Sequence, residues 1–460
     1  MNRRSSILPL MVSVVSRGFA AVSQLVLFWC LFRQLSKHDA GYFSVFYNSF
    51  VILAPLMLLG THQFGMRTLS EFDGRGTETS QAARGLLSMS LRTVICFVGL
   101  LVPLAYLGQL MIPQFVAGFS EQAGESGTVM ANQLPWLVGA SAFGAISLAV
   151  ASHLHGLRQL ARSIFFSHIA VPFATIVLLW YFGGDSTHDA VRCFFAATVI
   201  SATAAVVTWL VTFRQVGHSA EVSAQSAGQV AGGNSRWRSS LDFAAMNLCM
   251  LLMNWAPVII AGFLLLPDRV AELHIAQRSA NVTNFLLIVV GFTFAPQFRN
   301  AWAKDDVARF RNLVTQCSRL LIGVGTPIGI AVVLLSPNIM GLFGEDYRSA
   351  WLLLVILGIG QYLNLVTGTV NQILVMCGLE KTLRNITFYA CLFAIVATIV
   401  LSLWFGVVGA AVAIAMAVAL QNVVAVLAVH RKLGFWVFSV FPIAEAEPQG
   451  QVDTAEQSLA

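Results

Sequence analysis

Several ionisable and amide side chains lie inside long apolar stretches, and these residues have the clearest capacity for chemistry. Arg17 lies near the middle of the apolar stretch 7–32, far from both ends of the helix predicted there. A charged group at the centre of a bilayer costs about 2.5–3.5 kcal/mol on insertion scales, so it is a candidate functional residue. Ser13, Arg17 and Gln24 follow helical spacing and place a polar stripe on one face of this helix.

Three further apolar stretches carry polar stripes of the same kind. Their members are Asn247 and Asn254 on 241–265, His274, Gln277, Arg278, Asn281 and Asn284 on 271–295, and Gln361, Asn364, Asn371 and Gln372 on 350–376. Arginine binds phosphate through a fork of donors, and amides exchange hydrogen bonds with hydroxyl groups. The stripes therefore predict a wet, cationic cavity for an anionic, polyhydroxylated cargo. The alternative is that the amides hydrogen-bond between helices, at about 0.6 kcal/mol per contact.

Acidic residues are nearly absent from the same stretches. Asp242 and Glu272 lie near the starts of predicted helices. A pump for organic cations needs buried carboxylates as counter-charge and proton carrier, so the sequence disfavours that class. The sequence has no nucleotide-binding or hydrolytic motif. Its seven cysteines lie in or beside apolar stretches, which predicts neither a disulfide framework nor a metal site.

The composition indicates the elements that position these residues. Hydrophobic residues make up 57% and charged residues 10% of the 460 residues, against about 25% charged in soluble domains. Apolar runs near the ~20 residues that cross a bilayer recur throughout the chain, and the first is predicted to be retained as a helix. We predict an all-α polytopic membrane protein with twelve spans at 7–32, 41–66, 86–110, 131–154, 164–182, 191–213, 241–265, 271–295, 318–342, 350–376, 385–405 and 407–429.

The distribution of basic residues predicts the orientation. Nineteen Lys and Arg lie in segments on the N-terminal side of the membrane and six on the other side. By the positive-inside rule, both termini are expected to be cytoplasmic. The rule also accounts for the net charge of +6, so no nucleic-acid partner is predicted. The longest loop on the opposite side is expected at 112–130.

Two short stretches recur in the two halves of the chain. "HGLRQLAR" (155–162) and "CGLEKTLR" (377–384) place their glycines 222 residues apart, and "QFGMR" (63–67) has a partial echo in "QFRNA" (297–301). Both turns are predicted to be cytoplasmic, with Gly156 and Gly378 permitting them. The alternative explanation for the similarity is that short cytoplasmic loops often contain Gly and Arg. We predict parallel repeats forming two pseudo-symmetric six-helix lobes around a central cavity.

The predicted organisation has four parts. They are an N-lobe at 1–213, a cytoplasmic linker at 214–240, a C-lobe at 241–435 and a cytoplasmic tail at 436–460. The linker is rich in Gly, Ser and Ala, which is typical of a flexible joint. The tail is polar and mildly acidic, which is typical of a disordered segment.

Over about 1–435 the chain resembles the polysaccharide-transporter branch of the multidrug/oligosaccharidyl-lipid/polysaccharide (MOP) exporter superfamily. The stretches that carry the resemblance are "LSKHDAGYFSVF" (35–46), "PQFRNAWAKDDVARFRNLV" (296–314), "LFGEDYRSAWLLLVIL" (342–357) and the two turns at 156–162 and 378–384. The resemblance implies a flippase of the bacterial inner membrane that moves an undecaprenyl-diphosphate-linked oligosaccharide by alternating access.

The resemblance also carries expectations for residues and partners. Arg17 matches a first-helix arginine of related lipid-diphosphate flippases, which implies contact with the diphosphate. Some relatives have an acidic residue in the middle of helix seven, where this chain has Asn254. Coupling to H⁺ or Na⁺ through that position is therefore open, and no cofactor is expected. A polysaccharide polymerase and export machinery are the partners that such a flippase would have.

Two other functions remain to be distinguished. A cation-coupled multidrug antiporter of the same superfamily is the main alternative, although it would need a buried carboxylate. A major-facilitator carrier would also have six plus six helices, but "SEFDGRG" (70–76) matches only part of that family's motif. A glycan polymerase or ligase would need a sizeable catalytic loop outside the cytoplasm, and the sequence provides none. We therefore predict a transporter and no enzymatic activity.

Overall fold

The computed structural model describes residues 3–70, 77–117, 121–217 and 233–437 and consists of helices joined by short turns in these ranges. The first half of the chain forms the N-lobe. Its elements are α1 (Arg3–Gln34), α2 (Lys37–Leu56), α3 (Thr61–Ser70), α4 (Thr77–Ala117), α5 (Glu121–Gly156), α6 (Leu160–Ile164), the π-helical turn η1 (Phe165–Ile169), α7 (Ala170–Phe182) and α8 (Thr187–Gly217).

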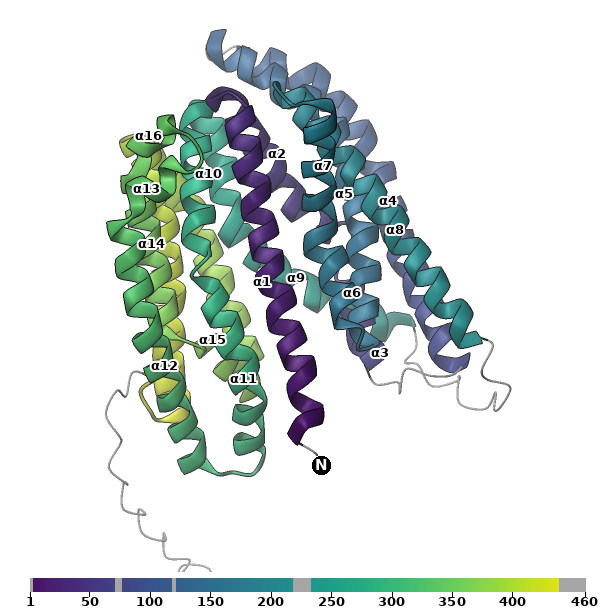
Figure 1. Ribbon diagram of the computed structural model, residues 1–460, viewed down its shortest axis with the longest axis vertical. Coiled ribbons are helices and arrows are strands. Elements are labelled where there is room, and N and C mark those ends of the chain that lie inside the picture. The colour runs from purple at the N-terminus through teal and green to yellow at the C-terminus, as the bar shows by residue number, and fades with distance from the viewer. Residues whose placement is uncertain (1–2, 71–76, 118–120, 218–232, 438–460) are drawn as a thin grey trace, which may run out of the picture.

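The second half forms the C-lobe, which stands beside the N-lobe with α1 between them in the view of Figure 1. Its elements are α9 (Gly233–Leu264), α10 (Pro267–Asn281), α11 (Asn284–Ala303), α12 (Val307–Leu334), α13 (Ser336–Gly341), the 3-10 turn η2 (Glu345–Ala350), α14 (Trp351–Thr367), α15 (Val370–Met376) and α16 (Glu380–Leu433). We call the end at which α1 starts the lower end and the opposite end the upper end, as in Figure 1.

The described helices account for the twelve predicted spans. Eight are long and apolar enough to cross a membrane, and two bent pairs raise the number to ten, namely α2 with α3 and Pro267–Gly291 with Thr293–Ala303. Helix α16 has 54 residues, about 80 Å at 1.5 Å per residue, which is too long for one crossing of a ~30 Å hydrocarbon core. It reverses at Gly406 (φ 60°, ψ −139°) and supplies two spans, while the apolar part of α1 supplies the twelfth.

One large apolar core joins the lobes at the upper end. It contains Phe28 and Phe43 from the N-lobe together with Leu273, Tyr347 and Leu354 from the C-lobe. Towards the lower end the two lobes have separate cores. One surrounds Leu154 and Trp209 of the N-lobe, and the other surrounds Phe298, Phe310 and Val429 of the C-lobe. Among the described side chains, the apolar core shared by both lobes therefore lies in the upper half.

The repeated turns have the same backbone hydrogen bonds, but in a register that differs from the sequence match. Gln159 N donates to Leu154 O, and Leu379 N donates to Leu374 O, so equivalent residues lie 220 positions apart. The left-handed residue of each turn is Arg158 (φ 61°) or Gly378 (φ 76°). The prediction for Gly378 is confirmed and that for Gly156 is wrong. A Cβ on Gly156 would lie 2.6 Å from Met66 O, so this glycine permits close packing of α5 on α3.

A further pair of similar stretches, which the sequence analysis does not identify, lies at corresponding ends of spans in the two lobes. Tyr181-Phe182-Gly183 ends α7, and Trp404-Phe405-Gly406 occupies the corresponding reversal in α16. Both glycines have positive φ, and the four aromatic side chains are exposed. Exposed aromatic residues at the ends of spans are typical of a membrane–water interface. These aromatic residues therefore mark the upper interface in both lobes.

Several predicted boundaries differ from the structure. The loop expected at 112–130 is wrong, because α4 continues to Ala117 and α5 begins at Glu121. These helices extend past the apolar run, which marks only the part inside hydrocarbon. Residues 218–232 and 438–460, which include most of the predicted linker and tail, lie outside the described residues. The division of the chain at 213, 240 and 435 stays a prediction.

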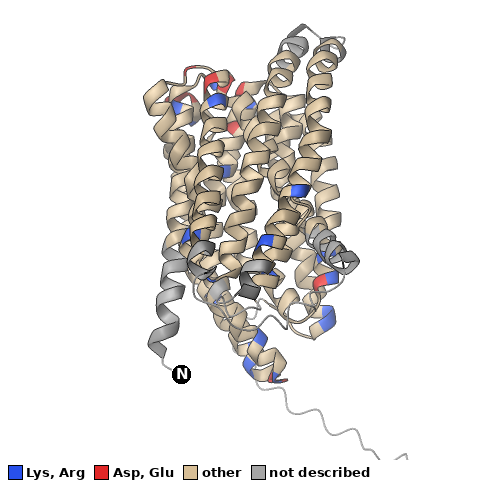
Figure 2. Cartoon of the chain, turned by 90° about the vertical axis from the view of Figure 1, so that its right-hand side faces the viewer, with Lys and Arg blue, Asp and Glu red and all other residues tan. Residues whose placement is uncertain are grey.

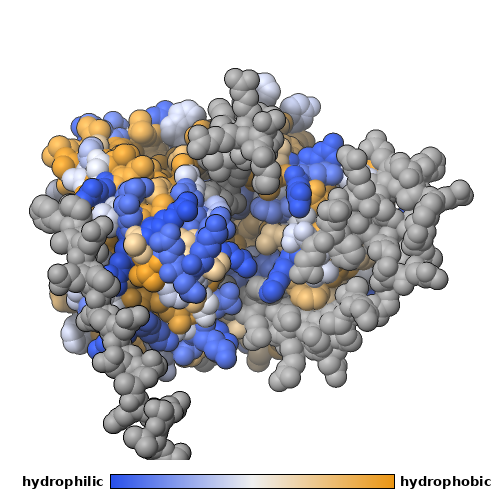
Figure 3. Space-filling model, turned by 90° about the horizontal axis from the view of Figure 1, so that it is seen from below, coloured by the Kyte–Doolittle hydropathy of each residue, from blue (hydrophilic) through white to orange (hydrophobic). Residues whose placement is uncertain are grey.

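Charged residues are distributed unequally between the two ends. Figure 2 shows several Asp and Glu residues close to Lys and Arg at the upper end, and mainly Lys and Arg at the lower end. Seen from below, hydrophilic residues cover much of the described surface (Figure 3). This distribution agrees with the count of basic residues made from the sequence. The cytoplasmic location of the termini stays a prediction.

Candidate functional site between the lobes

The upper part of the interface between the lobes depends on two close approaches of helices. A Cβ on Gly41 of α2 would lie only 2.0 Å from the carbonyl oxygen of Pro267, the first residue of α10. A Cβ on Gly262 of α9 would lie 2.3 Å from Val45 Cγ2 of α2. Because these glycines have no side chain, α2 can pack directly against α9 and α10.

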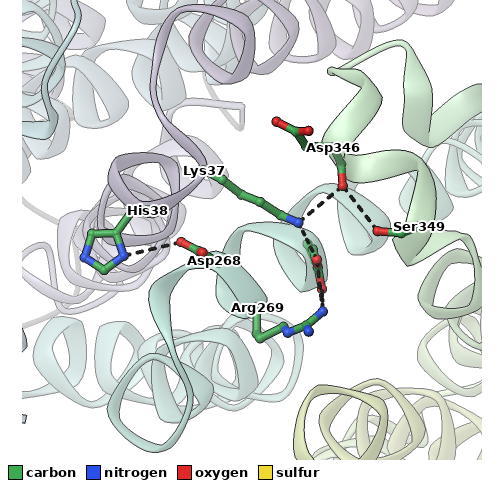
Figure 4. Close-up of polar contacts among 7 residues, drawn as sticks. Lys37, His38, Asp268, Arg269, Asp346 and Ser349 are labelled. Carbon is green, nitrogen blue, oxygen red and sulfur yellow. Dashed lines mark hydrogen bonds and ion pairs between the residues drawn. The ribbon is translucent and has the colours of Figure 1, made fainter. Parts of the chain in front are cut away.

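A group of charged residues holds the same end together, as Figure 4 shows. Lys37 Nζ of α2 lies 2.6 Å from Glu272 Oε1 of α10 and donates to the Asp346 carbonyl oxygen of η2 at 3.2 Å. Arg269 of α10 also pairs with Glu272, at 3.1 Å. Glu272 is buried, so its carboxylate depends on these two cations for compensation. We call Lys37, Arg269, Glu272 and Asp346 the upper latch.

Below the upper latch, Arg278 of α10 lies in a cage of aromatic rings. Its Cζ atom is 4.1 Å from the centroid of Trp255 and 4.9 Å from those of Phe28 and Tyr47. Arg278 Nη1 donates to Gln24 Oε1 of α1 at 3.3 Å. The side chain is only 9% exposed, and none of the ion pairs among the described residues includes it.

The donors of Arg278 are only partly used. Its Nε and Nη2 atoms are buried and have no hydrogen-bond partner within the described protein. The three cation–π contacts, at about 2 kcal/mol each at desolvated sites, offset part of the several kcal/mol that burial of the charge costs, but they use none of its N–H donors. The arrangement therefore leaves a desolvated positive charge with free donors between the lobes, where an anion would be stabilised.

His274 lies one helical turn before Arg278 and faces the N-lobe. Its Nδ1 atom is 2.8 Å from Asn48 Nδ2 of α2, and its ring packs against Phe28 and Phe32 of α1. The same Asn48 Nδ2 also donates to Ser44 O at 2.7 Å, which identifies it as the amide nitrogen. Its second N–H is then the donor to the imidazole. Nδ1 then accepts, which places the ring proton on Nε2, a buried atom without a partner in the described protein.

Four of the predicted amides of the C-lobe form a separate group with Asn422, which was not predicted, and we call this group the amide cluster. Its members, from α10, α11, α14 and α16, are Asn281, Asn284, Gln361, Asn364 and Asn422. Gln361 Nε2 donates to Asn281 Oδ1 at 2.9 Å, and Asn364 Nδ2 donates to Asn284 Oδ1 at 3.0 Å. Asn422 Nδ2 donates to Asn364 Oδ1 at 3.0 Å. These side chains therefore link four helices of one lobe.

The remaining predicted residues have different environments. The side-chain Nδ2 of Asn254 donates to Met250 O in its own helix, while the backbone carbonyl oxygen of Asn254 accepts from Gln277 Nε2 at 2.6 Å. Asn247 is half-buried on α9, and Asn371 has a buried Oδ1 without a partner in the described protein. The backbone of Arg17 lies in α1, but its side chain lies outside the described residues. Its expected contact with a diphosphate stays a prediction.

A small cavity adjoins the Arg278 cage on the N-lobe side. Its volume is about 70 Å³, and its walls include Gln24 and Tyr47, both of which contact Arg278. Ser147, Ser167 and His168 contribute polar groups from the N-lobe. A cavity of this volume can hold a few water molecules next to Gln24 and Tyr47, the two wall residues that contact the guanidinium.

Sequence reasoning missed several participants. Asn48 and Asn422 are amides within apolar stretches, so the rule that selected the other amides would have found them. Tyr47 and Trp255 gave no signal, because aromatic residues are common in membrane helices. Lys37 and Glu272 are separated by 235 positions, and only the packing of α2 against α10 brings them together.

Comparisons with known proteins identify relatives of similar sequence and solved structures of similar fold. No family model matches the chain. A probable low-salt glycan biosynthesis flippase, Agl15 of Haloferax volcanii, is 26% identical over 174 residues, which are 37% of this chain and 36% of that protein. The match thus spans about a third of that relative's length.

Solved structures extend the similarity to nearly the whole chain. The lipid II flippase MurJ in an inward closed conformation has a TM-score of 0.63 at 12% identity, covering 91% of this chain and 87% of that one. A multidrug resistance MATE family transporter of the MOP superfamily in an inward-facing conformation has a TM-score of 0.61 at 15% identity, covering 90% and 94%. The fold of this chain is therefore that of MOP superfamily transporters, which confirms the resemblance at the level of the fold.

Proposed function

We propose that this chain, which has the fold of the MOP superfamily, is a flippase for a lipid-linked oligosaccharide with an undecaprenyl-diphosphate carrier. The observation that carries the proposal is Arg278, a buried guanidinium between the lobes with two unused donor atoms. Relatives named as flippases in both comparisons support the same class of transported molecule.

A diphosphate is the part of this cargo that Arg278 would bind. Arginine presents its donors in a fork that matches phosphate oxygens, and its charge persists at any physiological pH. Gln24 and Asn254 lie nearby on α1 and α9, where amides can bind sugar hydroxyls. Arg278 donates to Gln24, and Gln277 of the same helix donates to the backbone carbonyl oxygen of Asn254. The guanidinium would thus bind the carrier group, and the surrounding amides would bind the glycan.

The packing of the lobes supports alternating access. Apolar contacts, two glycines and the upper latch close the upper end, while the lower halves have separate cores. With the predicted orientation, the lower end faces the cytoplasm, where a lipid-linked repeat unit is made. Transport would then require the upper contacts to separate and the lower halves to close. A polymerase and export machinery would take up the product on the other side.

Translocation in proteoliposomes tests the proposal. The purified protein is reconstituted with a fluorescent undecaprenyl-diphosphate oligosaccharide, and transfer is followed by quenching with an impermeant reductant. We expect Arg278→Ala to lower the rate about 10- to 100-fold, as for the loss of a charge-assisted hydrogen bond. Arg278→Lys keeps the charge but loses the fork and should give an intermediate rate.

Arg348→Ala is the matched control, because Arg348 is an exposed arginine of η2 that pairs only with nearby Glu345 among the described residues. It should translocate at the wild-type rate. A wild-type rate for a folded Arg278→Ala protein would contradict the role of Arg278. If that variant does not fold, the wild-type protein is used to test the proposal. A monophosphate-linked cargo should then compete for translocation much less effectively than the diphosphate-linked cargo.

A cation-coupled multidrug antiporter is the second candidate, and the aromatic rings around Arg278 are the observation that favours it. Phe28, Tyr47 and Trp255 have faces that can bind an organic cation, but Arg278 covers them in this structure. The candidates predict opposite results. Arg278→Ala should lower the rate of glycolipid transfer about 10- to 100-fold in a flippase, whereas in an antiporter it should increase the efflux of ethidium from cells.

A further inference from the structure

Two apolar grooves lie at the lower end, one in each lobe and apart from the interface between the lobes. The N-lobe groove, about 510 Å³, lies between the α6–η1 segment and α8. The C-lobe groove, about 540 Å³, lies between the two antiparallel halves of α16. Both expose mainly apolar surface and have at least one basic side chain, and Asn385 and Gln421 add amides to the C-lobe groove.

The two grooves occupy equivalent positions in the repeat. The turns that precede them are related by 220 positions, and the same offset relates Phe166 in the N-lobe groove to Ile386 in the C-lobe groove. Each groove therefore starts within one or two helical turns of the repeated turn. This agreement indicates a feature of the six-helix unit, because a chance surface irregularity would not recur in both lobes.

The groove walls expose large apolar groups within membrane-spanning helices. Val207 and Val211 are 53% and 50% exposed in the N-lobe groove, and Tyr389 is 68% exposed in the C-lobe groove. The helices that carry them are among those able to cross a membrane. In a membrane, apolar surface exposed at such positions is covered by hydrocarbon chains, so a lipid chain is the fitting occupant.

Basic residues at the groove ends provide charge complementarity. Lys432 Nζ donates to Thr382 Oγ1 at 2.6 Å, which holds it over the same turn as Lys381. Arg162 donates to Gln159 Oε1 at 3.0 Å and Thr212 Oγ1 at 3.4 Å, which holds it beside the N-lobe groove. None of the ion pairs among the described residues includes these three cations. Their charges thus remain available to an anion.

We propose that each groove binds one anionic glycerophospholipid. An acyl chain lies along the apolar walls, and the phosphate lies at Arg162 in the N-lobe or between Lys381 and Lys432 in the C-lobe. The lower end, which the sequence predicts to be cytoplasmic, would face the leaflet in which anionic lipids contribute about 1 kcal/mol per nearby basic residue. The sites are distinct from the cage of Arg278 and do not depend on the transported molecule.

Native mass spectrometry of the detergent-purified protein tests the proposal. Phosphatidylglycerol and phosphatidylcholine with identical chains are titrated separately. The wild type should retain two molecules of phosphatidylglycerol more tightly than any phosphatidylcholine. We expect affinity at the C-lobe site to fall about fivefold for each basic residue removed in Lys381→Gln and Lys432→Gln, and similarly at the N-lobe site for Arg162→Gln.

Two further sets of variants separate charge from shape. Lys304→Gln removes an exposed lysine from the α11–α12 turn, outside both grooves, and should bind as the wild type does. Val424→Trp and Val211→Trp fill the grooves but keep the cations, and each should remove one bound lipid. Equal retention of the two lipids, or unchanged binding by the three charge variants, would overturn the proposal. Binding of undecaprenyl phosphate in place of phosphatidylglycerol would overturn the assignment of the occupant.

Discussion

The polar contacts between the lobes differ from those of the amide cluster inside the C-lobe. Between the lobes, they involve charged or aromatic groups, as in the pairing of Lys37 with Glu272 and the packing of Arg278 on Phe28. Inside the C-lobe, the amide cluster uses only neutral side chains that bond to one another. Under the proposed alternating access, the contacts between lobes would break, whereas those within a lobe could persist through the whole cycle.

This difference explains why the polar stripes do not serve one purpose. An amide that is paired within a rigid lobe stabilises that lobe without opposing movement. A charge at the lobe interface can exchange its partner for solvent or cargo when the interface opens. The predictions below test whether the two regions differ in this way.

The largest effect should come from a covalent link across the upper interface. A Cβ on Gly262 would lie 3.5 Å from Val45 Cβ, which suits a disulfide. In a variant without the seven native cysteines, Val45→Cys with Gly262→Cys should lose all translocation on oxidation and recover it on reduction. Each single cysteine variant is a control and should not respond to oxidant. Full transport by the oxidised double variant would show that the upper interface does not open.

A smaller but still large effect is expected from breaking the upper latch. Lys37→Ala removes the hydrogen bond from Lys37 of the N-lobe to Glu272 of the C-lobe. A hydrogen bond between charged groups contributes about 1.5–3 kcal/mol to stability. The population open at the upper end should rise at least tenfold, measured as maleimide labelling of Val45→Cys in a cysteine-free protein.

Arg269→Ala provides the matched control for the upper latch. It removes the other cation of Glu272, but Arg269 and Glu272 belong to the same helix and are only three residues apart. Maleimide labelling should therefore change much less than in Lys37→Ala. Equal labelling of the two variants would mean that burial of the Glu272 charge, and not the link between lobes, determines the effect.

The smallest effect should come from the amide cluster. Asn364→Ala removes the bonds to Asn284 and Asn422, at about 0.6 kcal/mol each on average for polar contacts in membranes. We expect thermal stability to fall by a few degrees at most, with translocation retained after reconstitution. A severe loss of transport by a stable Asn364→Ala protein would instead indicate contact with the cargo.

Parts of the fold and site follow directly from local sequence. The length of the apolar runs predicts the number of spans, and the repeated turns predict two related lobes. The rule that polar groups are costly in hydrocarbon selects Gln24, His274 and Arg278, which the structure brings together between the lobes. The same rule selects Asn281 and Gln361, although they pair within one lobe. Residue type alone cannot distinguish the two cases, because a polar side chain avoids lipid in both.

By itself, the sequence determined that the chain is a helical membrane protein of two six-helix halves, and which residues cannot face lipid. These properties depend on composition and short-range periodicity, because these determine which segments and which helix faces are more stable in lipid than in water. Only the tertiary structure decided that Lys37 pairs with Glu272 across 235 positions, that Arg278 has two unused donors, and that one apolar core joins the lobes at the upper end. Those outcomes depend on how helices distant in sequence pack, and packing depends on shape and on glycines such as Gly41, which no local pattern reveals.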